Sequence, residues 1–332
     1  MTARLRVAVI GGGANGEHEV SLASAAAAAE ALDPVRYEAV PFTIDRQGGW
    51  LHAGAAYTFA EASAVLAGCD VALPLIHGAP GEDGTLAALC TLVGLPFVGS
   101  GIGASAIAMD KQATKLVARS VGVRTALGTL LSSASGDGFA WERPVVVKPV
   151  TGGSSQGVTP VHDPADLRAA IKAAFAWSDR VLVEDFVVGR EIDIAVFAEG
   201  EKLVVSPPLE IRSTGFFDYD AKYGQKHTDE VEFVVPAPLT ANELRRLEQH
   251  ALDLYQALGC RGVARLDFFL DEQGWLLNEV NTTPGFTAKS QVPLMYQAAG
   301  IPYPQLLTRL IQAALPNPGL PHSLRLSRDQ AL

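Results

Sequence analysis

Short apolar runs alternate with longer helical stretches along the first hundred residues. The apolar runs predict strands at residues 7–10, 37–44, 71–76 and 95–98. An alanine-rich stretch at 19–32 and a segment that begins near Thr85 predict helices between them. Strands that alternate with helices are typical of a parallel, doubly wound sheet. We therefore predict an N-terminal doubly wound α/β domain over residues 1–100.

The pattern after residue 100 predicts two further domains and a tail. In the central one, 101–188, it predicts helices at 109–121 and 165–177 and strands at 144–149 and 181–186. In the C-terminal one, 189–316, it predicts strands at 192–197 and 202–206, helices at 241–258 and 304–314, a polar loop at 212–232, and a hairpin over 262–280 that turns at 271–274. We expect the proline-containing tail, 317–332, to be loose.

The composition is that of a globular protein with two or three domains. The chain has 332 residues, and 48% are hydrophobic, so it can bury a sizeable core. Its formal net charge of -10 argues against the basic face that nucleic-acid binding needs. No apolar run reaches the roughly 18 residues of a membrane helix, and three scattered cysteines without a CxxC pair argue against a disulfide framework. We therefore expect a cytoplasmic protein that binds neither nucleic acid nor a membrane.

A glycine-rich turn follows the first predicted strand. Residues 11–16 match the dinucleotide-binding pattern GxGxxG between a strand and a helix. A ribose-binding acid is expected about 20 residues further on, whereas the best candidate, Asp45, lies 29 positions after Gly16. Glu17 is better explained as the partner of a cationic group, such as a substrate ammonium. The alternative is that Glu17 and Glu19 only complement the helix dipole.

Two more loops follow predicted strands. Residues 151–157 come after Lys148 and lack the GK[ST] ending of a P-loop, but their backbone N–H groups can still cradle phosphates. The alternative is a solvated lysine beside a linker. His77 begins a glycine-rich loop at a position where parallel sheets bind ligands, and we expect either a ligand contact or a satisfied loop histidine.

The predicted hairpin carries the strongest chemical signal. Residues i and i+2 of a strand face the same way, so Arg265 shares a face with Asp267, and Glu279 shares a face with Asn281. The turn then brings two carboxylates and an amide oxygen together beside an arginine. Such oxygen ligands suit magnesium bound with substrate phosphates, and the arginine would neutralise a phosphoryl group or an oxyanion. The alternative is a surface hairpin with salt bridges.

Taken in order, these motifs resemble the D-alanine–D-alanine ligase family. The matching pieces are the glycines with Glu17-His18-Glu19-Val20-Ser21-Leu22, His77-Gly78 with 81–85, Met109-Asp110-Lys111, Lys148-Pro149 with Gly153-Ser154-Ser155, Glu184 with Gly189-Arg190-Glu191, 217–223, Arg265-Leu266-Asp267 and 279–285. Each piece is weak alone, but the ordered set is highly specific and covers residues 7–312. The resemblance implies a three-domain α/β ATP-grasp fold, with ATP between the central and C-terminal domains, and a homodimer.

The resemblance also implies which residues hold ATP and metal. Lys111, Lys148 and Lys222 would lie near the ATP phosphates with Ser155, Glu184 would meet the adenine beside the Val187 backbone, and Glu191 would meet the ribose. Asp267, Glu279 and Asn281 would hold two magnesium ions, with manganese as a substitute.

The implied reaction joins two D-alanines into D-alanyl-D-alanine through a D-alanyl phosphate, for peptidoglycan precursor synthesis. Glu17, Ser154 and Tyr223 would close two loops over the substrates, and His77 would lie near the first D-amino acid. Arg265, the Gly285 N–H and Ser290 would contact the reacting and acceptor groups.

Three polar residues depart from the usual family pattern, namely Gln156, Lys289 and Gln291. Gln291 replaces an apolar residue beside the acceptor, so we expect either another acceptor, such as D-serine, or a tolerated substitution. Tyr223 argues against the D-lactate type, and the insertion at 224–228 leaves the conformation of the second lid open. The rival hypotheses are another ATP-grasp carboxylate–amine ligase, a nucleotide-binding module without ligase chemistry and, more distantly, an NAD-dependent dehydrogenase.

Overall fold

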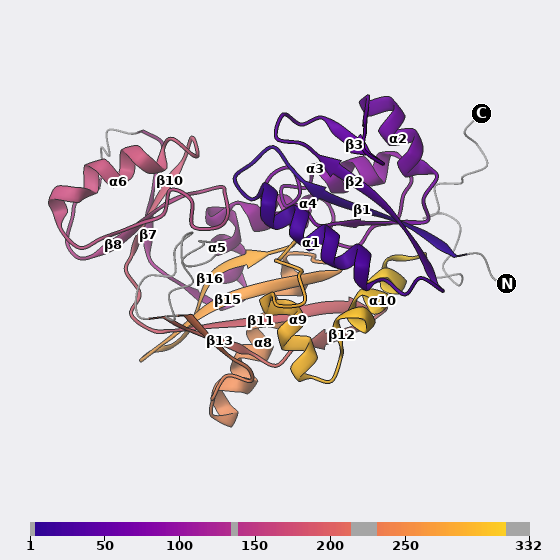
Figure 1. Ribbon diagram of the computed structural model, residues 1–332. Helices are drawn as coiled ribbons and strands as arrows, with labels where there is room; N and C mark the ends of the chain where they lie inside the picture. The colour runs from indigo at the N-terminus through magenta and orange to yellow at the C-terminus, as the bar shows by residue number, and fades with distance from the viewer. Residues whose placement is uncertain (1–3, 134–138, 214–230, 317–332) are drawn as a thin grey trace.

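Three sheets organise the computed structural model, which describes residues 4–133, 139–213 and 231–316 (Figure 1). In Figure 1 the N-terminal lobe lies at the upper right, the small central lobe at the left and the C-terminal lobe below both. The predicted residues Lys222 and Tyr223, the insertion at 224–228 and the tail lie outside the described residues. Among the helices in these three ranges, none is both long and apolar enough to cross a membrane.

The N-terminal sheet is built on three parallel strands. Its order is β4-β3-β2-β1-β5, formed by β1 (Leu5–Gly12), β2 (Tyr37–Ile44), β3 (Trp50–His52), β4 (Ala55–Tyr57) and β5 (Val71–Pro74). The pairing of β1 with β2 and β5 confirms the predicted parallel core, and the β3–β4 hairpin adds two antiparallel strands that were not predicted. Three helices accompany it, α1 (His18–Ala31), α2 (Phe59–Ala67) and α3 (Thr85–Leu92).

The strand predicted at 95–98 is wrong. This segment makes only one bridge, between Phe97 and Ala72. Pro96 lacks an N–H, so it cannot donate to a neighbouring strand.

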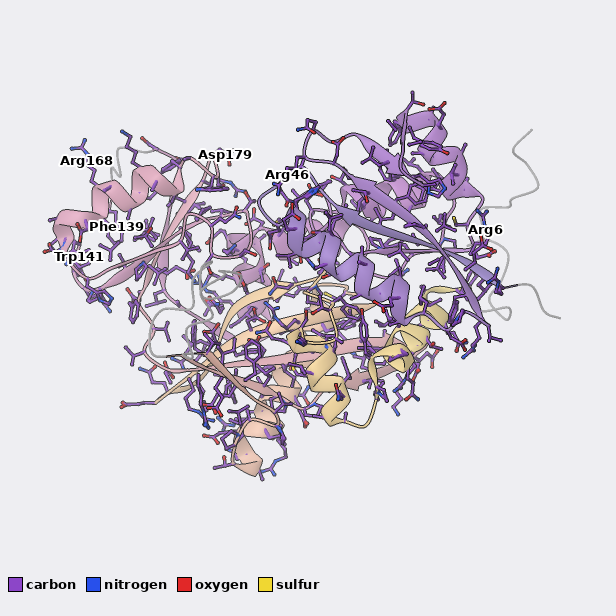
Figure 2. The ribbon with its side chains drawn as sticks, in the orientation of Figure 1. Arg6, Arg46, Phe139, Trp141, Arg168 and Asp179 are labelled. Atoms are coloured by element: carbon purple, nitrogen blue, oxygen red, sulfur yellow. The ribbon has the colours of Figure 1, made fainter. Side chains whose placement is uncertain are left out.

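The central sheet is antiparallel and closes a core of its own. Its order is β7-β10-β8-β9, formed by β7 (Gly128–Leu131), β8 (Val145–Pro149), β9 (Thr159–Val161) and β10 (Val181–Asp185). A 3-10 turn, η1 (Pro164–Asp166), leads into α6 (Leu167–Ala174), which packs on β8. Phe139 and Trp141, labelled at the outer end of this lobe in Figure 2, pack against the same core.

The helix predicted at 109–121 is confirmed as α5 (Lys111–Ser120), whereas α4 (Ile102–Met109), which precedes it and meets it at Asp110, was not predicted. Asp110 has an extended backbone, and its carboxylate accepts a hydrogen bond from the Ala113 N–H at 2.8 Å, which caps α5. The break sets Lys111 at the start of α5, where its ammonium donates to the Gly152 carbonyl at 2.7 Å.

The C-terminal sheet contains the predicted hairpin. Its order is β14-β13-β11-β15-β16-β6 with β12 paired to β11, formed by β6 (Arg124–Thr125), β11 (Arg190–Glu199), β12 (Lys202–Val205), β13 (Leu209–Ser213), β14 (Val231–Val234), β15 (Val263–Asp271) and β16 (Gly274–Asn281). Helices α8 (Ala241–Ala257), α9 (Gln291–Ala298) and α10 (Tyr303–Ala314) complete the lobe, and α9 was not predicted. The turn at 271–274 is confirmed. Strands β13 and β14 occupy both ends of the stretch predicted as a loop.

One apolar core joins the N-terminal and C-terminal sheets. It contains Val9 of β1, Phe197 of β11, Tyr296 of α9 and Leu310 of α10, all of them buried. Helices α1 and α10 are in contact (Figure 1). The N-terminal and C-terminal lobes therefore share one core, whereas the central lobe packs around its own.

Candidate active site

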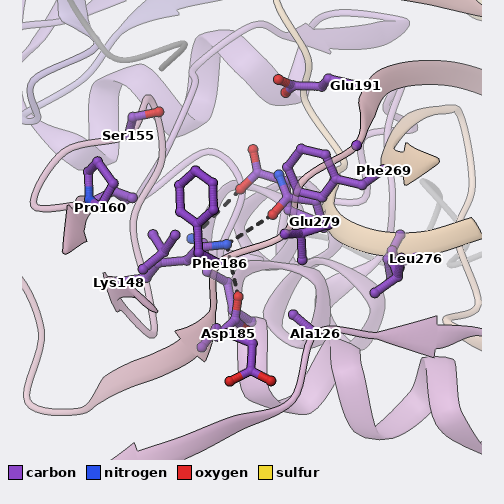
Figure 3. Close-up of a pocket in the computed structure, with 18 of the residues that line it drawn as sticks. Ala126, Lys148, Ser155, Pro160, Asp185, Phe186, Glu191, Phe269, Leu276 and Glu279 are labelled. Carbon is purple, nitrogen blue, oxygen red and sulfur yellow. Dashed lines mark hydrogen bonds and ion pairs between the residues drawn. The ribbon is translucent and has the colours of Figure 1, made fainter. Parts of the chain in front are cut away.

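A cleft separates the central sheet from the C-terminal sheet. It holds a cavity of about 540 Å³, a size typical of small-molecule sites. Both lobes line it: Lys148 and Glu184 come from the central sheet, and Phe269, Leu276 and Glu279 come from the β15–β16 hairpin. In Figure 3, Ser155 and Pro160 lie on one side of this cavity and Phe269 and Leu276 on the other, with Lys148 and Phe186 between them. Val187 and Glu191 also line it, so every described residue predicted to bind ATP faces one cavity.

A buried carboxylate holds two lysines at the floor of this cavity. Glu184 is 1% exposed, and its two oxygens lie 2.6 Å from the Lys115 ammonium and 2.9 Å from the Lys148 ammonium. Burial alone would raise the pKa of Glu184, but the charges of Lys148 and Lys115 outweigh burial and hold the pKa below its ordinary value. Lys148 also donates to the Asn278 side chain at 3.0 Å. Two ammonium groups against one carboxylate leave a net positive charge beside the cavity.

The glycine-rich loop 151–157 docks on the N-terminal lobe. The Ser154 hydroxyl donates to a carboxylate oxygen of Glu17. Gly153 lies so close to Glu17 that an added Cβ would come within 2.8 Å of its carboxylate. A Cβ added to Gly16 would likewise clash with the Gln156 side chain. Ser154 and Ser155 both have positive φ, at 50° and 57°, a conformation sparsely populated by residues other than glycine and often associated with function.

The hairpin brings the predicted charged residues together. Arg265 lies opposite Asn281 and Asp267 lies opposite Glu279 in the strand register. Arg265 donates twice to Asp267, from Nε and Nη2, each at 2.7 Å, and Asn281 donates to Asp267 at 3.0 Å. Burial alone would lower the pKa of Arg265, but Asp267 and Asp193 raise it well above its ordinary value, so the guanidinium stays charged. The alternative of a surface hairpin with salt bridges does not describe this buried cluster.

Residues of the N-terminal lobe fix the loop that follows β16. The His77 Nδ1–H donates to the Thr283 carbonyl at 2.7 Å, and its Nε2 lies 3.0 Å from the Ser24 hydroxyl. Burial lowers the pKa of His77 to about 4, so the ring is neutral. Both ring nitrogens therefore have protein partners, as the alternative of a satisfied loop histidine expected.

Glu82 makes a second connection to the same loop. Its carboxylate accepts hydrogen bonds from the Thr283 N–H at 3.0 Å and the Gly78 N–H at 2.8 Å. Burial and the charge of Glu17 raise the pKa of Glu82 to about 7, against the lowering effect of both hydrogen bonds. The loop is thus positioned by the N-terminal lobe.

Gly285, Ser290 and Gln291 lie together at the end of this loop. An added Cβ on Gly285 would lie 3.3 Å from the Ser290 hydroxyl, which also accepts from the Thr287 N–H at 3.0 Å. The Gln291 side chain accepts from Arg265 at 2.7 Å and donates to Asp193 at 2.8 Å. Gln291 therefore joins the charged cluster of the hairpin.

The structure adds residues that the motifs did not single out. Asp193 and Lys115 are buried in the site, and only the i, i+4 spacing of Lys115 from Lys111 could have pointed to it. Asp45, the candidate ribose-binding acid, instead accepts hydrogen bonds from the Gln47 and Gly49 N–H groups of its own turn. Glu19 pairs with Arg46 at 2.7 Å on the surface, whereas Glu17 is bonded to Ser154 of the glycine-rich loop.

Comparisons with known proteins agree with this geometry. The family profile described as "D-ala D-ala ligase C-terminus" matches residues 139–312, and "D-ala D-ala ligase N-terminus" matches 6–64 and 55–100. The chain is 39% identical to a D-alanine–D-alanine ligase of Nocardia farcinica, covering 95% of this chain and 98% of that one. It is 34% identical to that of Geobacillus kaustophilus, covering 94% and 95%.

Solved structures agree as well. The VanG D-Ala:D-Ser ligase from Enterococcus faecalis has a TM-score of 0.80 at 31% identity, covering 94% of this chain and 100% of that chain. The D-alanine–D-alanine ligase from Bacillus anthracis complexed with ATP has a TM-score of 0.75 at 29% identity, covering 93% and 97%.

Proposed function

The chain belongs to the D-alanine–D-alanine ligase family, whose fold is ATP-grasp, and from this premise we propose that it joins two D-alanines into D-alanyl-D-alanine for peptidoglycan synthesis. ATP is converted to ADP and phosphate. The observation that carries the proposal is the convergence on one cleft of a lysine-lined cavity, the Arg265–Asp267 cluster and a glycine-rich loop docked on Glu17.

ATP lies in the cavity between the central and C-terminal lobes. Lys111, Lys148 and Ser155 face its phosphates, together with Lys222, which lies outside the described residues. Glu184 and the Val187 backbone meet the adenine, and Glu191 meets the ribose. The positive charges that Lys111 and Lys148 bring to the cavity support phosphate binding there.

Asp267, Glu279 and Asn281 hold two magnesium ions, and manganese can replace magnesium. Asp193, Asp267 and Glu279 carry three negative charges against the positive charges of Arg265 and of Lys111, whose ammonium lies 3.9 Å from Glu279, and the remaining negative charge favours a cation. Two carboxylates and one amide side chain, set opposite one another or two residues apart on paired strands, suit magnesium, which binds through one or two carboxylates plus substrate phosphates.

The reaction follows from the charges. A carboxylate oxygen of the first D-alanine attacks the γ-phosphorus, ADP leaves, and a D-alanyl phosphate forms. When bound, magnesium offsets the charge on the transferring phosphoryl group. The amine of the second D-alanine then attacks the acyl carbon, and Arg265 and the Gly285 N–H stabilise the resulting oxyanion. Phosphate leaves and the amine gives up a proton.

The neighbouring residues orient the two amino acids and exclude water, which would hydrolyse the acyl phosphate. Glu17 pairs with the ammonium of the first D-alanine, and its hydrogen bond with Ser154 keeps the glycine-rich loop over the site. The loop that follows β16, residues 282–290, is called the acceptor loop, and His77 holds it through the Thr283 carbonyl. Tyr223 completes the closed arrangement from the segment outside the described residues, and Ser290 contacts the acceptor.

The domain organisation proposed for this enzyme is 1–100, 101–188 and 189–316. Residues 102–125 of the central segment pack on the C-terminal sheet, through α4, α5 and β6. We also propose that the enzyme is a cytoplasmic homodimer that binds neither nucleic acid nor a membrane.

Phosphate release from ATP and magnesium tests the function, first with D-alanine alone and then with D-serine, D-lactate or L-amino acids added. Products are identified by mass. Turnover to D-alanyl-D-alanine with D-alanine alone supports the proposal. A mixed product that forms only when a second substrate is added would show that the acceptor is that substrate and not D-alanine, while the ligase mechanism would still hold.

A further inference from the structure

The Gln291 side chain lies between two charged groups at the start of α9. Its carbonyl oxygen accepts from Arg265 Nη1 at 2.7 Å, and its amide nitrogen donates to Asp193 Oδ2 at 2.8 Å. Asp193 lies on β11 and Arg265 on β15, so Gln291 joins two groups that are far apart in the sequence. A side chain whose amide is engaged at both ends is already oriented within the protein.

We propose that Gln291 is a positioning residue that, together with Asp193, aims Arg265 at the acceptor side of the site. This inference rests on the proposed ligation, in which Arg265 stabilises the oxyanion. It differs from the expectation that Gln291 itself recognises the side chain of the acceptor.

The strand register explains why Arg265 needs such a partner. Asp193 lies directly opposite Asp267 on the neighbouring strand, and it is 0% exposed. The Arg265 Nε lies 2.7 Å from Asp267, and it also lies within 3.4 Å of Asp193. Two carboxylates therefore compete for one guanidinium, and a side chain pulled toward Asp193 would turn away from Asp267.

Gln291 resolves this competition without adding charge. Its amide nitrogen satisfies the Asp193 oxygen that lies nearest Arg265, and its carbonyl oxygen holds the third guanidinium nitrogen. Nε and Nη2 remain paired with Asp267. An apolar side chain at 291 would leave one Arg265 N–H and one Asp193 oxygen without these hydrogen bonds, which is costly for buried polar groups.

The contact also couples Arg265 to the acceptor loop. Gln291 directly follows Ser290, which is the residue before α9 and lies beside Gly285. The guanidinium and the Gly285–Ser290 segment are therefore held in one arrangement. A displacement of about 1 Å at such a group can cost about 100-fold in rate.

The first test compares Gln291→Leu with Gln297→Leu, which makes the same change at an exposed glutamine of the same helix. We expect Q291L to lower kcat about 10- to 100-fold while the KM values for ATP and D-alanine stay within about twofold. Q297L should match the wild-type enzyme. An unchanged kcat with a changed KM for the acceptor, or a new D-serine product, would overturn the proposal in favour of direct acceptor recognition.

The second test reverses one hydrogen bond. Asp193→Asn and Gln291→Glu should each lower kcat, because the first removes a carboxylate and the second sets two carboxylates together. In the double variant D193N/Q291E, the new amide at position 193 can donate to the new carboxylate at position 291. That carboxylate still accepts from Arg265, and the total charge is restored. We expect the double variant to regain at least about tenfold in kcat over Q291E, a coupling within the range of contacting residues.

The outcomes separate this inference from the proposed function. Thermal melting of all variants identifies any that do not fold, and kcat is compared among the folded variants, with D193N/Q291E also compared directly with wild type. Failure of D193N/Q291E to recover activity overturns the positioning role while the wild-type turnover still stands. A wild-type enzyme that makes no D-alanyl-D-alanine overturns the proposed function, and this inference with it.

Discussion

Replacing Lys115 by Met removes one of the two lysines on Glu184 and keeps the length of the side chain. Lys115 is 3% exposed on α5, and its ammonium lies 2.6 Å from Glu184. At that distance and an effective dielectric constant of about 20, the pair attraction is about 6 kcal/mol, before the cost of desolvation is subtracted. Removing one partner of a buried pair typically costs about 3–5 kcal/mol. Since Lys148 still compensates Glu184, we expect about 3 kcal/mol, at the lower end.

Two measurements check this value. Thermal unfolding without nucleotide should show K115M melting about 6 °C below the wild-type enzyme, at about 2 °C per kcal/mol for a chain of this size. The KM for ATP should rise, because Lys148 is then the only lysine paired with Glu184 and the floor of the cavity loses its net positive charge. Lys172→Met, an exposed lysine on α6, is the matched control and should change neither quantity.

A double-mutant cycle decides whether the ion pair is the cause. Glu184→Gln alone leaves two buried ammonium groups facing each other, whereas K115M/E184Q leaves only Lys148. The double variant should therefore be less destabilised than the sum of the single ones, by about 2–3 kcal/mol. Additive effects, or a K115M melting temperature within about 1 °C of wild type, would refute the reasoning.

Three further predictions concern the acceptor loop, the metal and the glycine-rich loop. Because burial lowers the pKa of His77 from 6.5 to about 4, the unfolded chain binds more protons than the folded one between these pH values. The difference in unfolding free energy between wild type and His77→Gln should therefore be fully present above pH 6.5 and fall by about 3 kcal/mol as the pH drops to 4. A difference, measured by urea unfolding, that does not vary with pH would contradict this. Asp267→Asn should lower kcat by about 100-fold or more and raise the magnesium concentration needed for half-maximal phosphate release, and wild-type magnesium dependence would exclude Asp267 as a ligand. Gly153→Ala places a Cβ 2.8 Å from the Glu17 carboxylate and should lower kcat about tenfold, whereas Gly103→Ala, with open space around it, should not; equal rates for both would show that the loop does not need this close approach.

The hairpin and its turn at 271–274 were predictable from sequence because their geometry is local. The final alignment of the charged residues was not, because a regular ladder from this turn would pair Asp267 with Asn278. A register shift between Asp267 and Phe268 instead sets Asp267 opposite Glu279 and Arg265 opposite Asn281. The parallel core of the N-terminal sheet followed in the same way from strands alternating with helices. Both depend on short-range periodicity.

The partners of Gln291 and Glu184 were not predictable by such rules. Asp193 lies 98 residues from Gln291, and the pattern around it reads only as an apolar strand. Lys115 sits on a helix whose lysines would ordinarily be solvated, and its burial depends on how α5, packed on β16 and β6 of the C-terminal sheet, directs the ammonium to Glu184 of the central sheet. Helix α4 was missed because its eight residues show no clear division between an apolar and a polar face.

The shared core has a consequence for how the chain folds during synthesis. Strand β1 leaves the ribosome long before α10, but the apolar cluster on which it packs includes Leu306 and Leu310 of α10. The face of the N-terminal sheet that packs on α10 therefore stays uncovered until α10 has been translated. The central lobe has no such delay, because the buried members of its apolar cluster, among the residues that the structure describes, all lie between 131 and 183. Folding would then begin in the middle of the chain and end by joining its two ends.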